Sequence, residues 1–293
     1  MSKNIAMYLM NQKGYYVLDK YLKHFGPSKM EAVISSPDPG MDKDFFSEIR
    51  DLCRIYDIKF YCRNEKPDLK AKYLFAIGWR WLIKDCDNLI IFHDSLLPKY
   101  RGFAPLVSSL INKEEYIGVT ALFASSEYDE GDIIAQEAVK IKYPIKIAVA
   151  IEKIQEIYFS LVKKIAENIL SAQKLARQPQ NKSEATYSLW RDERDYQIDW
   201  NKDAEYIKRF IDAVGYPYKR ASCSLNSAGV RIIDSIVVPD IKIENRVPGK
   251  VVFVQEGLPV VVCGKGLLKI LAAINEATGE SVLPLTKFRT RFE

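Results

Sequence analysis

The chain has few of the residues on which metal sites and disulfide scaffolds depend. Its 293 residues include only two histidines, His24 and His93, and five cysteines without a Cys-x-x-Cys pair. A zinc site is therefore not expected, and the odd number of scattered cysteines predicts free thiols in a reducing cytoplasm. The scarcity of histidine also makes any histidine chemistry easy to locate.

Long apolar runs are missing as well. The longest, 89–92 and 251–254, have only the length of a strand, whereas a transmembrane helix needs about 20 apolar residues. The first residues lack the apolar core of a signal peptide. We therefore expect no membrane partner. No Gly-x-Gly-x-x-Gly motif follows the first predicted strand, which argues against a dinucleotide-dependent dehydrogenase.

Neither charge sign is in large excess. The 43 basic and 38 acidic residues give a net charge of +5, which divides into +2 for 1–174 and +3 for 175–293. An even, weak charge does not indicate a large surface that follows nucleic-acid phosphates. The hydrophobic share of 48% and the charged share of 28% are close to the average of globular proteins. The length suggests about two domains.

Hydrophobic periodicity predicts an α/β domain in the first part of the chain. Nearly continuous apolar strands alternate with segments of helical spacing, which is typical of a parallel sheet. We expect an open, mostly parallel, Rossmann-like sheet with helices on both faces. Strands are expected at 5–9, 32–35, 58–60, 73–77, 89–92 and 119–122, and helices at 14–24, 43–56, 104–112 and after Pro144.

A polar segment with little periodicity, 173–186, is expected to link this domain, 1–172, to a second one, 187–293. The second domain is predicted to contain one helix, capped by Asn201, and about five short antiparallel strands. This combination is typical of a small OB-like β-barrel. Its strands are expected at 221–225, 230–238, 250–254, 258–263 and 267–271.

The segment richest in chemistry begins at the end of a predicted central strand. It reads Phe-His-Asp-Ser-Leu-Leu-Pro-Lys-Tyr-Arg-Gly-Phe-Ala-Pro over 92–105. In open α/β sheets, ligands bind at the carboxyl ends of the strands. Asp129 follows another predicted strand, so His93 and Asp129 are candidates for an acid/base pair in which the carboxylate orients the imidazole. The alternative for a lone histidine at a strand end is a structural role.

These segments resemble the folate-dependent formyltransferase family. The family pattern reads Asn-x-His-Pro-Ser-Leu-Leu-Pro, then Tyr-Arg-Gly, Pro, Gly-Val-Thr and Asp-x-Gly-x-Ile-x-x-Gln. The resemblance extends to Asp199-Trp200 and to 248–251, while residues 1–70 match only in the order of strands and helices. The matching residues are His93, Ser95, Leu96, Leu97, Pro98, Tyr100, Arg101, Gly102, Pro105, Gly118, Val119, Thr120, Asp129, Gly131, Ile133 and Gln136.

The resemblance implies an enzyme that moves a formyl group from N10-formyltetrahydrofolate to a primary amine without a metal. His93 and Asp129 would be the catalytic residues, and Asp94 a candidate for catalytic support. Ordinary core positions are the alternative for the two tryptophans of the implied folate pocket. The residues implied to border the folate are Ile77, Gly78, Trp79, Arg80, Trp81, Leu82 and Asp129.

The pattern breaks at two positions. Ile91 stands where the family has a catalytic Asn and cannot donate a hydrogen bond, and Asn88 would face the other side of a regular strand. Asp94 replaces the Pro that follows the histidine. Loss of one oxyanion donor typically costs about 10²–10³ in rate. Either a backbone N–H, a water or a charged His93 takes the role, or the chain is a weak or inactive relative; the other motif residues favour the former.

The weak, evenly spread charge and the short segment 10–14 after the first strand argue against transfer RNA as a nucleic-acid partner. We therefore expect the acceptor to be a nucleotide-linked amino sugar, as in polysaccharide biosynthesis. The alternatives are a methionyl-tRNA formyltransferase and a non-catalytic relative that binds folate or sugar. Substrate contacts are expected at Asn11, Lys13, Lys99 and Arg101.

Three of these contacts have an alternative. Lys13 and Lys99 would otherwise be solvated surface charges, and Arg101, whose planar guanidinium suits a phosphate, would otherwise brace its own loop. Three roles stay open for the C-terminal barrel: to orient substrate, to bind a nucleotide, or to form a homodimer interface.

Overall fold

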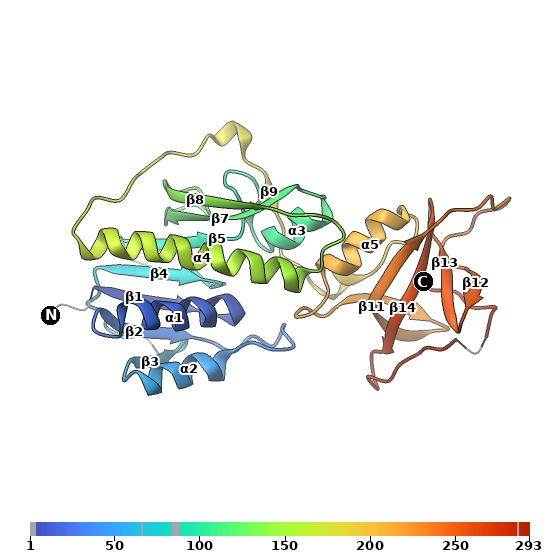
Figure 1. The fold of residues 1–293 in the computed structure, drawn as a ribbon, viewed down its shortest axis with the longest axis horizontal. Helices are drawn as coiled ribbons and strands as arrows, with labels where there is room; N and C mark the ends of the chain where they lie inside the picture. Colours follow the sequence, from blue (N-terminus) through green and yellow to red (C-terminus); the bar gives the residue numbers. More distant parts are fainter. Residues whose placement is uncertain (1–3, 66, 84–87, 286) are drawn as a thin grey trace. The chain divides into compact units, whose positions relative to one another are not determined.

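The computed structural model describes residues 4–65, 67–83, 88–285 and 287–293 (Figure 1). The chain forms two compact units, the first made of 1–106, 115–141 and 150–189 and the second of 107–114, 142–149 and 190–293. The segment expected to be a linker is bonded to the first unit, because Gln178 pairs with Ile133. The domain boundaries drawn from the sequence stay a prediction.

A seven-stranded sheet is the framework of the first unit, with the order β3-β2-β1-β4-β5-β7-β8. The strands from β3 to β5 run parallel, whereas β5 and β7, and β7 and β8, are antiparallel neighbours. The expected mostly parallel α/β sheet is thus confirmed, with an antiparallel edge. The strands are β1 (Ile5–Leu9), β2 (Met30–Ser35), β3 (Lys59–Cys62), β4 (Tyr73–Ile77), β5 (Leu89–His93), β7 (Tyr116–Phe123) and β8 (Ile133–Lys140).

The edge strand β8 lies in a segment for which no strand was predicted. Half-buried and exposed residues alternate along most of β8, because only one face of this edge strand is covered by other parts of the protein. Polar residues on the other face conceal the strand from a search for continuous apolar runs. A further pair of short parallel strands, β6 (Arg101–Gly102) and β9 (Tyr187–Ser188), was not expected either.

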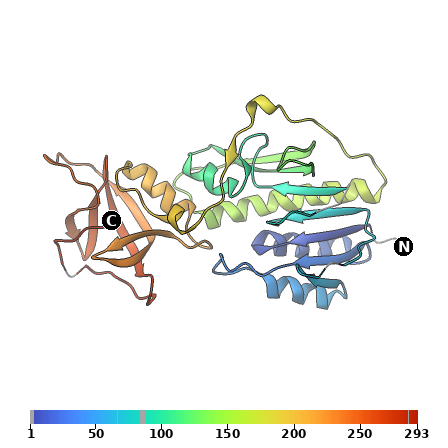
Figure 2. The ribbon, with the colours of Figure 1, turned by 180° about the vertical axis from the view of Figure 1, so that it is seen from behind.

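Helices cover one face of the sheet (Figures 1 and 2). The helix α1 contacts α4 through a hydrogen bond from Gln12 to Gln155 and reaches the start of α2 through the rings of Tyr15 and Phe45. The helices on this face are α1 (Asn11–Phe25), α2 (Phe46–Ile55) and α4 (Ile147–Leu170). The short helix α3 (Pro105–Ile111) belongs mostly to the second unit.

The opposite face differs from the expectation of helices on both sides. Leu69, Ala71 and Trp79 pack there against a cluster of buried strand residues that includes Leu74 and Leu89. These three residues come from the connections around β4, which contain no helix among the described residues. His93 lies on this side, because it shares the face of Leu89 and Ile91.

The second unit is built on a five-stranded antiparallel sheet with the order β10-β11-β14-β13-β12. The end of the chain bonds to both edge strands: the N–H of Val251 donates to the carbonyl of Thr290 at 3.1 Å, and the N–H of Glu293 donates to that of Ser224 at 3.0 Å. The antiparallel C-terminal domain is confirmed, while its OB-like identity stays a prediction. The elements are α5 (Ala204–Ala213), β10 (Ala221–Leu225), β11 (Ala228–Val238), β12 (Val251–Gln255), β13 (Leu258–Val262) and β14 (Leu267–Asn275).

The sequence predicts free thiols in a reducing cytoplasm and no membrane span, and the structure describes cysteines and helices that these expectations concern. Burial raises the pKa of Cys53, Cys223 and Cys263 to about 12, so these thiols stay protonated near neutral pH. Cys62 is exposed and free, and Cys86 lies outside the described residues. No described helix has the length and apolar character needed to cross a membrane. The cytoplasmic location stays a prediction.

The cap of α5 provides a test of local stability. Asp203, and not Asn201, caps the helix by accepting a hydrogen bond from the N–H of Tyr206 at 2.5 Å. We expect Asp203→Ala to lower the free energy of unfolding by about 1 kcal/mol, measured by urea denaturation. The control is Asn201→Ala, which removes a polar side chain that makes no cap. Equal losses in the two variants would contradict the assignment.

Candidate active site

The strands β1, β4 and β5 end in line at one edge of the sheet. Leu9 is the register partner of Ile77, and Ile77 is the partner of Phe92. The residues that follow these positions, Met10, Gly78 and His93, therefore lie side by side at the carboxyl edge. This is the edge at which open α/β sheets bind ligands.

The imidazole of His93 is held in one orientation. Its Nε2 lies 2.8 Å from the carbonyl oxygen of Tyr100, and the side chain is almost buried, with 7% exposed. A carbonyl oxygen only accepts hydrogen bonds, so Nε2 carries a proton and donates it. Nδ1 is left to face the carboxylate of Asp129, whose Oδ2 is 3.6 Å away. Nδ1 is thus the ring atom available to exchange a proton with a substrate.

Asp129 reaches His93 by a route that its position in the sequence does not reveal. It follows β7, but β7 is antiparallel to β5, and the end of β7 pairs at Phe123 with Ile90, near the start of β5. The connection 124–132 must fold back along the sheet to bring Asp129 to His93. Asp129 does follow the carboxyl end of a strand, as expected. That end of β7, however, lies at the opposite edge of the sheet from the carboxyl end of β5, where His93 stands.

The returning loop is fixed by backbone hydrogen bonds at Asp129. Its Oδ2 accepts a hydrogen bond from the N–H of Gly102 at 2.8 Å, and its backbone carbonyl accepts one from Gln180 Nε2 at 2.7 Å. The same Gln180 nitrogen lies 2.9 Å from the carbonyl of Gly131. The carboxylate therefore points at His93 because both its side chain and its backbone are held.

Arg101 connects this loop to the segment that follows His93. Its Nη1 forms a 2.6 Å ion pair with Glu130, and its Nε and Nη2 donate to Gln180 Oε1 at 3.2 and 2.8 Å. The side chain is 1% exposed. In this position the guanidinium of Arg101 stabilises the loop that carries Asp129. Such a structural role was the alternative to a phosphate contact. Substrate binding by Arg101 stays a prediction that this geometry does not support.

The remaining motif residues shape the loop that follows His93. Thr120 Oγ1 donates to the carbonyl of Ser95 at 2.6 Å and accepts from the N–H of Leu97 at 3.1 Å. Gln136 Nε2 donates to the carbonyl of Leu97 at 2.7 Å. A Cβ on Gly118 would lie 2.6 Å from a methyl carbon of Leu96, so only glycine fits there. These residues act through the loop geometry.

Asp94 and Lys13 bond to one another and not to His93. The Asp94 carboxylate accepts hydrogen bonds from Lys13 Nζ and from the hydroxyl of Tyr158 in α4. Successive residues of a strand point to opposite faces, so Asp94 faces the helices while His93 faces the other way. Both charged side chains are 12% exposed, whereas Lys99 lies at the surface. The proposed support by Asp94 would have to act through the backbone.

Ile91 occupies the position of the family's asparagine and packs in an apolar environment. It lies on the same face as His93, two residues earlier, and contacts the cluster of Leu97, Leu122 and Ile133. Asn88 precedes β5 and lies at its other end, so it is no substitute. The missing donor is therefore not restored by a nearby amide side chain of this strand.

The implied folate segment turns two tryptophans toward each other. The ring of Trp79 meets those of Tyr8 and Trp81 edge to face, with centroids 5.0 and 5.1 Å apart, and Arg63 lies 4.0 Å from the centre of the Trp81 ring. Trp79 Nε1 is buried and has no acceptor among the described groups. Aromatic faces with an unused N–H donor fit a flat heteroaromatic ring that carries acceptors. Trp79 also packs against buried residues of the core, as expected if it were an ordinary core residue.

The other residues of that segment have mixed surroundings. Ile77 is fully buried, Gly78 adopts a positive φ of 65°, and Leu82 is 64% exposed. Arg80 forms a 2.6 Å ion pair with the buried Asp38.

Sequence reasoning misses three groups that build the site. Gln180 lies in a polar segment without any motif, and only the folded chain brings it to Arg101 and Asp129. The carbonyl of Tyr100 and the N–H of Gly102 act through the backbone, so residue type alone could not disclose them; their place inside the motif was the only signal.

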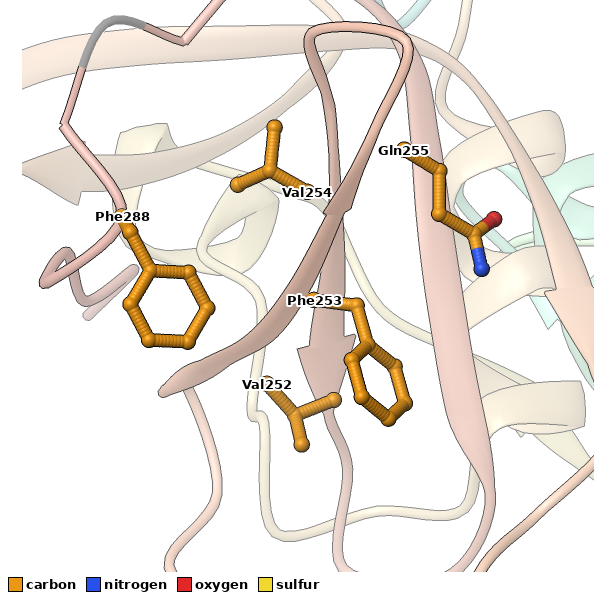
Figure 3. A pocket seen from close by; sticks show the side chains of 5 residues that line it. All are labelled: Val252, Phe253, Val254, Gln255 and Phe288. Carbon is orange, nitrogen blue, oxygen red and sulfur yellow. The ribbon is translucent and has the colours of Figure 1, made fainter.

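A separate shallow pocket lies in the second unit beside the edge strand β12 (Figure 3). It is lined by Phe253, Phe288, Gln255 and two valines. Without an acid, a base or a nucleophile it cannot carry the chemistry of His93 and Asp129.

The chain is similar to known proteins over most of its length. Residues 61–156 match the family described as formyl transferase, and 192–283 match the formyl transferase C-terminal domain. The methionyl-tRNA formyltransferase of Streptococcus sanguinis is 31% identical over 268 residues, which are 86% of this chain and 84% of that protein.

Two solved structures share the fold. The N-formyltransferase of Helicobacter canadensis, in complex with folinic acid and dTDP-3-aminofucose, has a TM-score of 0.68 at 22% identity, over 92% of this chain and 99% of that one. WlaRD, a sugar 3N-formyl transferase, has a TM-score of 0.64 at 20% identity, over 91% and 96% of the two chains.

The fold, together with these family matches, defines a group-transfer enzyme. The chain belongs to the formyltransferase family, and it is a formyltransferase.

The hold of Gln180 on the Asp129 loop can be tested. We expect Gln180→Ala to lower kcat/KM for formyl transfer by up to about 10²-fold, because misplacement of a catalytic group by about 1 Å has an effect of that size. The control is Asn181→Ala, the exposed neighbour whose side chain bonds only locally. Unchanged activity of Gln180→Ala, measured with steady-state kinetics, would show that the loop is held without it.

Proposed function

We propose that this formyltransferase moves the formyl group of N10-formyltetrahydrofolate to the primary amine of a nucleotide-linked amino sugar. The observation that carries the reaction is the pairing of His93 Nδ1 with Asp129 at the carboxyl edge of β5. The sugar substrate is supported by the weak, even charge of the chain and by the fold shared with proteins solved with dTDP-3-aminofucose or described as a sugar 3N-formyl transferase.

The chemistry asks for a base and for a group that stabilises negative charge. A bond forms between the amine nitrogen and the formyl carbon, the bond from that carbon to N10 breaks, and one amine proton is transferred to N10. Asp129 is the base in this proposal, because its Oδ1 accepts no hydrogen bond from any described residue while Oδ2 is held by Gly102. His93 passes the proton or shields the charge on the formyl oxygen.

His93 is also the proposed replacement for the family's asparagine. With Nε2–H committed to the Tyr100 carbonyl, protonation of Nδ1 gives an imidazolium whose second N–H points into the site. The carboxylate of Asp129, 3.6 Å from Nδ1, lies where it can pair with such a cation. An N–H of a cation is a strong hydrogen-bond donor, so it offsets the apolar Ile91.

Folate and sugar are assigned to different sides of the end of β4. The segment Ile77–Leu82, with its tryptophan faces, is proposed to hold the folate, which supplies the formyl group when bound. Asn11 and Lys99 are proposed for the nucleotide sugar; Lys99 is an exposed cation beside the site and suits a diphosphate. Lys13 and Arg101 are paired internally and serve the frame of the site.

A second candidate is methionyl-tRNA as the acceptor, which the Streptococcus sanguinis relative favours. Phosphate contacts with a transfer RNA would make binding fall steeply with salt. A small nucleotide sugar, with two phosphates, has a much weaker salt dependence.

The roles of the pair predict large losses of activity. We expect His93→Ala and Asp129→Asn each to lower kcat by about 10²–10⁴, the usual contribution of general acid–base catalysis. The control is His24→Ala, which removes the other histidine at a half-exposed position on α1. Activity of His93→Ala within a few-fold of the unaltered protein would overturn the assignment.

The acceptor is tested by offering the protein a panel with N10-formyltetrahydrofolate: dTDP-3-aminofucose, other nucleotide-linked amino sugars, and methionyl-tRNA. Mass spectrometry detects the added formyl group. We expect formylation of at least one nucleotide sugar and none of the transfer RNA. Formylation of the transfer RNA alone, with steep salt dependence, would replace the proposed substrate and leave the formyltransferase chemistry intact.

A further inference from the structure

A second polar cluster lies at the same edge of the sheet, beyond the ends of β1, β2 and β4. At its centre is Asp38, which is 3% exposed. Its Oδ2 accepts hydrogen bonds from Asn11 Nδ2 at 3.0 Å and from Arg80 Nη2 at 2.6 Å, and its Oδ1 accepts one from the N–H of Gly40 at 3.1 Å. The proposed chemistry does not use this carboxylate, so its effect is to hold Asn11 and Arg80 in place.

Asp38 determines which atom of the Asn11 amide is left over. A carboxylate only accepts, so the NH₂ group of the amide faces Asp38 and the carbonyl oxygen Oδ1 faces elsewhere. Oδ1 is buried and accepts no hydrogen bond from any group in the described part of the chain, although Asn11 is only 8% exposed. Buried polar atoms in proteins almost always have a partner. An acceptor held this way is suited to a ligand that brings an O–H or N–H donor.

The backbone of Asn11 supports the same conclusion. Its φ is 61°, in the left-handed region that asparagine enters more readily than most residues. The residue opens α1 directly after β1. A strained conformation that places an unsatisfied acceptor is a common feature of ligand-binding positions.

The register sets the reach from Asn11 to the catalytic histidine. The ends of β1 and β5 are separated by β4 alone, so two strand spacings of about 4.8 Å each lie between them. These spacings are measured between strand backbones, so Asn11 and His93 lie at the same carboxyl edge, within the length of a single nucleotide sugar.

We propose that Asn11 Oδ1 accepts a hydrogen bond from a ring hydroxyl of the amino sugar whose amine is formylated at His93, and that Asp38 is the positioning residue for this contact. This inference rests on the proposed function. Asn11 then determines which sugars are accepted, because a sugar without that hydroxyl leaves the buried acceptor unpaired.

The folate is a less suitable partner for this atom. Trp79, in the proposed folate segment, packs with Tyr8 on the face of the sheet that lacks helices, whereas Asn11 begins a helix on the other face. Asn11 therefore lies away from the tryptophan rings. Arg80 of the folate segment shares its partner Asp38, so the KM for the folate is measured beside that for the sugar.

The test compares the unaltered protein with Asn11→Gly, a change that keeps the positive φ free of strain while it removes the acceptor. Each is assayed with dTDP-linked amino sugars and with analogues that lack one ring hydroxyl. The matched control is Asn226→Gly, the same substitution at an exposed turn residue with a φ of 50° in the second unit. Circular dichroism checks folding.

For the unaltered protein we expect kcat/KM to fall about 10- to 100-fold with one deoxy analogue, the effect of one buried hydrogen bond. Asn11→Gly should have a similarly raised KM for the hydroxylated sugar, no preference between sugar and analogue, and an unchanged KM for the folate. Asp38→Asn should lose part of the same preference, while Asn226→Gly keeps it.

Each other result overturns the inference in a recognisable way. A raised KM for the folate alone in Asn11→Gly would assign the acceptor to the folate. Equal use of all deoxy analogues by the unaltered protein would reject the hydroxyl contact, and this arm needs no variant to fold. In both cases formylation of the nucleotide sugar would still support the proposed function, whereas its absence from all sugars would reject the function itself.

Discussion

The hydrogen bond from His93 Nε2 to the carbonyl of Tyr100 is the constraint on which the active site depends. It uses one ring nitrogen for structure and leaves the other for chemistry. The Tyr100 carbonyl lies directly before Arg101 in the segment that follows His93. The side chain of Arg101 is held by Glu130 and Gln180. Because Gln180 also holds the backbone of Asp129, a single set of contacts positions both His93 and Asp129.

The two departures from the family motif have a simple explanation in the geometry of a strand. Residues 91 and 93 share the face that carries the site, so Ile91 removes a donor from the site and adds to the apolar surface beside it. Residue 94 points to the helices, where the charge of Asp94 is compensated by Lys13 and by the hydroxyl of Tyr158. The first change alters the chemistry available to the enzyme, and the second alters how α1 and α4 attach to β5.

Much of the fold follows from local pattern. The apolar strands and the amphipathic helices of the first unit are visible as periodicity, and four of the five strands of the second unit begin or end at a predicted residue. The edge strand β8 and the paired strands β6 and β9 were not predicted, because a half-exposed strand or a two-residue strand has no apolar run that a sequence pattern could show. The predicted cap of α5, Asn201, is wrong. The helix begins at Ala204, so Asp203 is the residue whose side chain reaches the N–H of Tyr206.

The sequence by itself determined the family and the class of reaction and predicted the pair His93 and Asp129, because these depend on residue types at regular spacing within one segment or two. Only the tertiary structure decided how Asp129 returns to His93 from an antiparallel strand, that Arg101 is buried as a brace, and that Gln180 joins them. It also decided that Asn11 presents an unpaired acceptor beside Asp38. These features depend on contacts between residues far apart in the chain, and hydrogen-bond partners of that kind leave no local pattern to read.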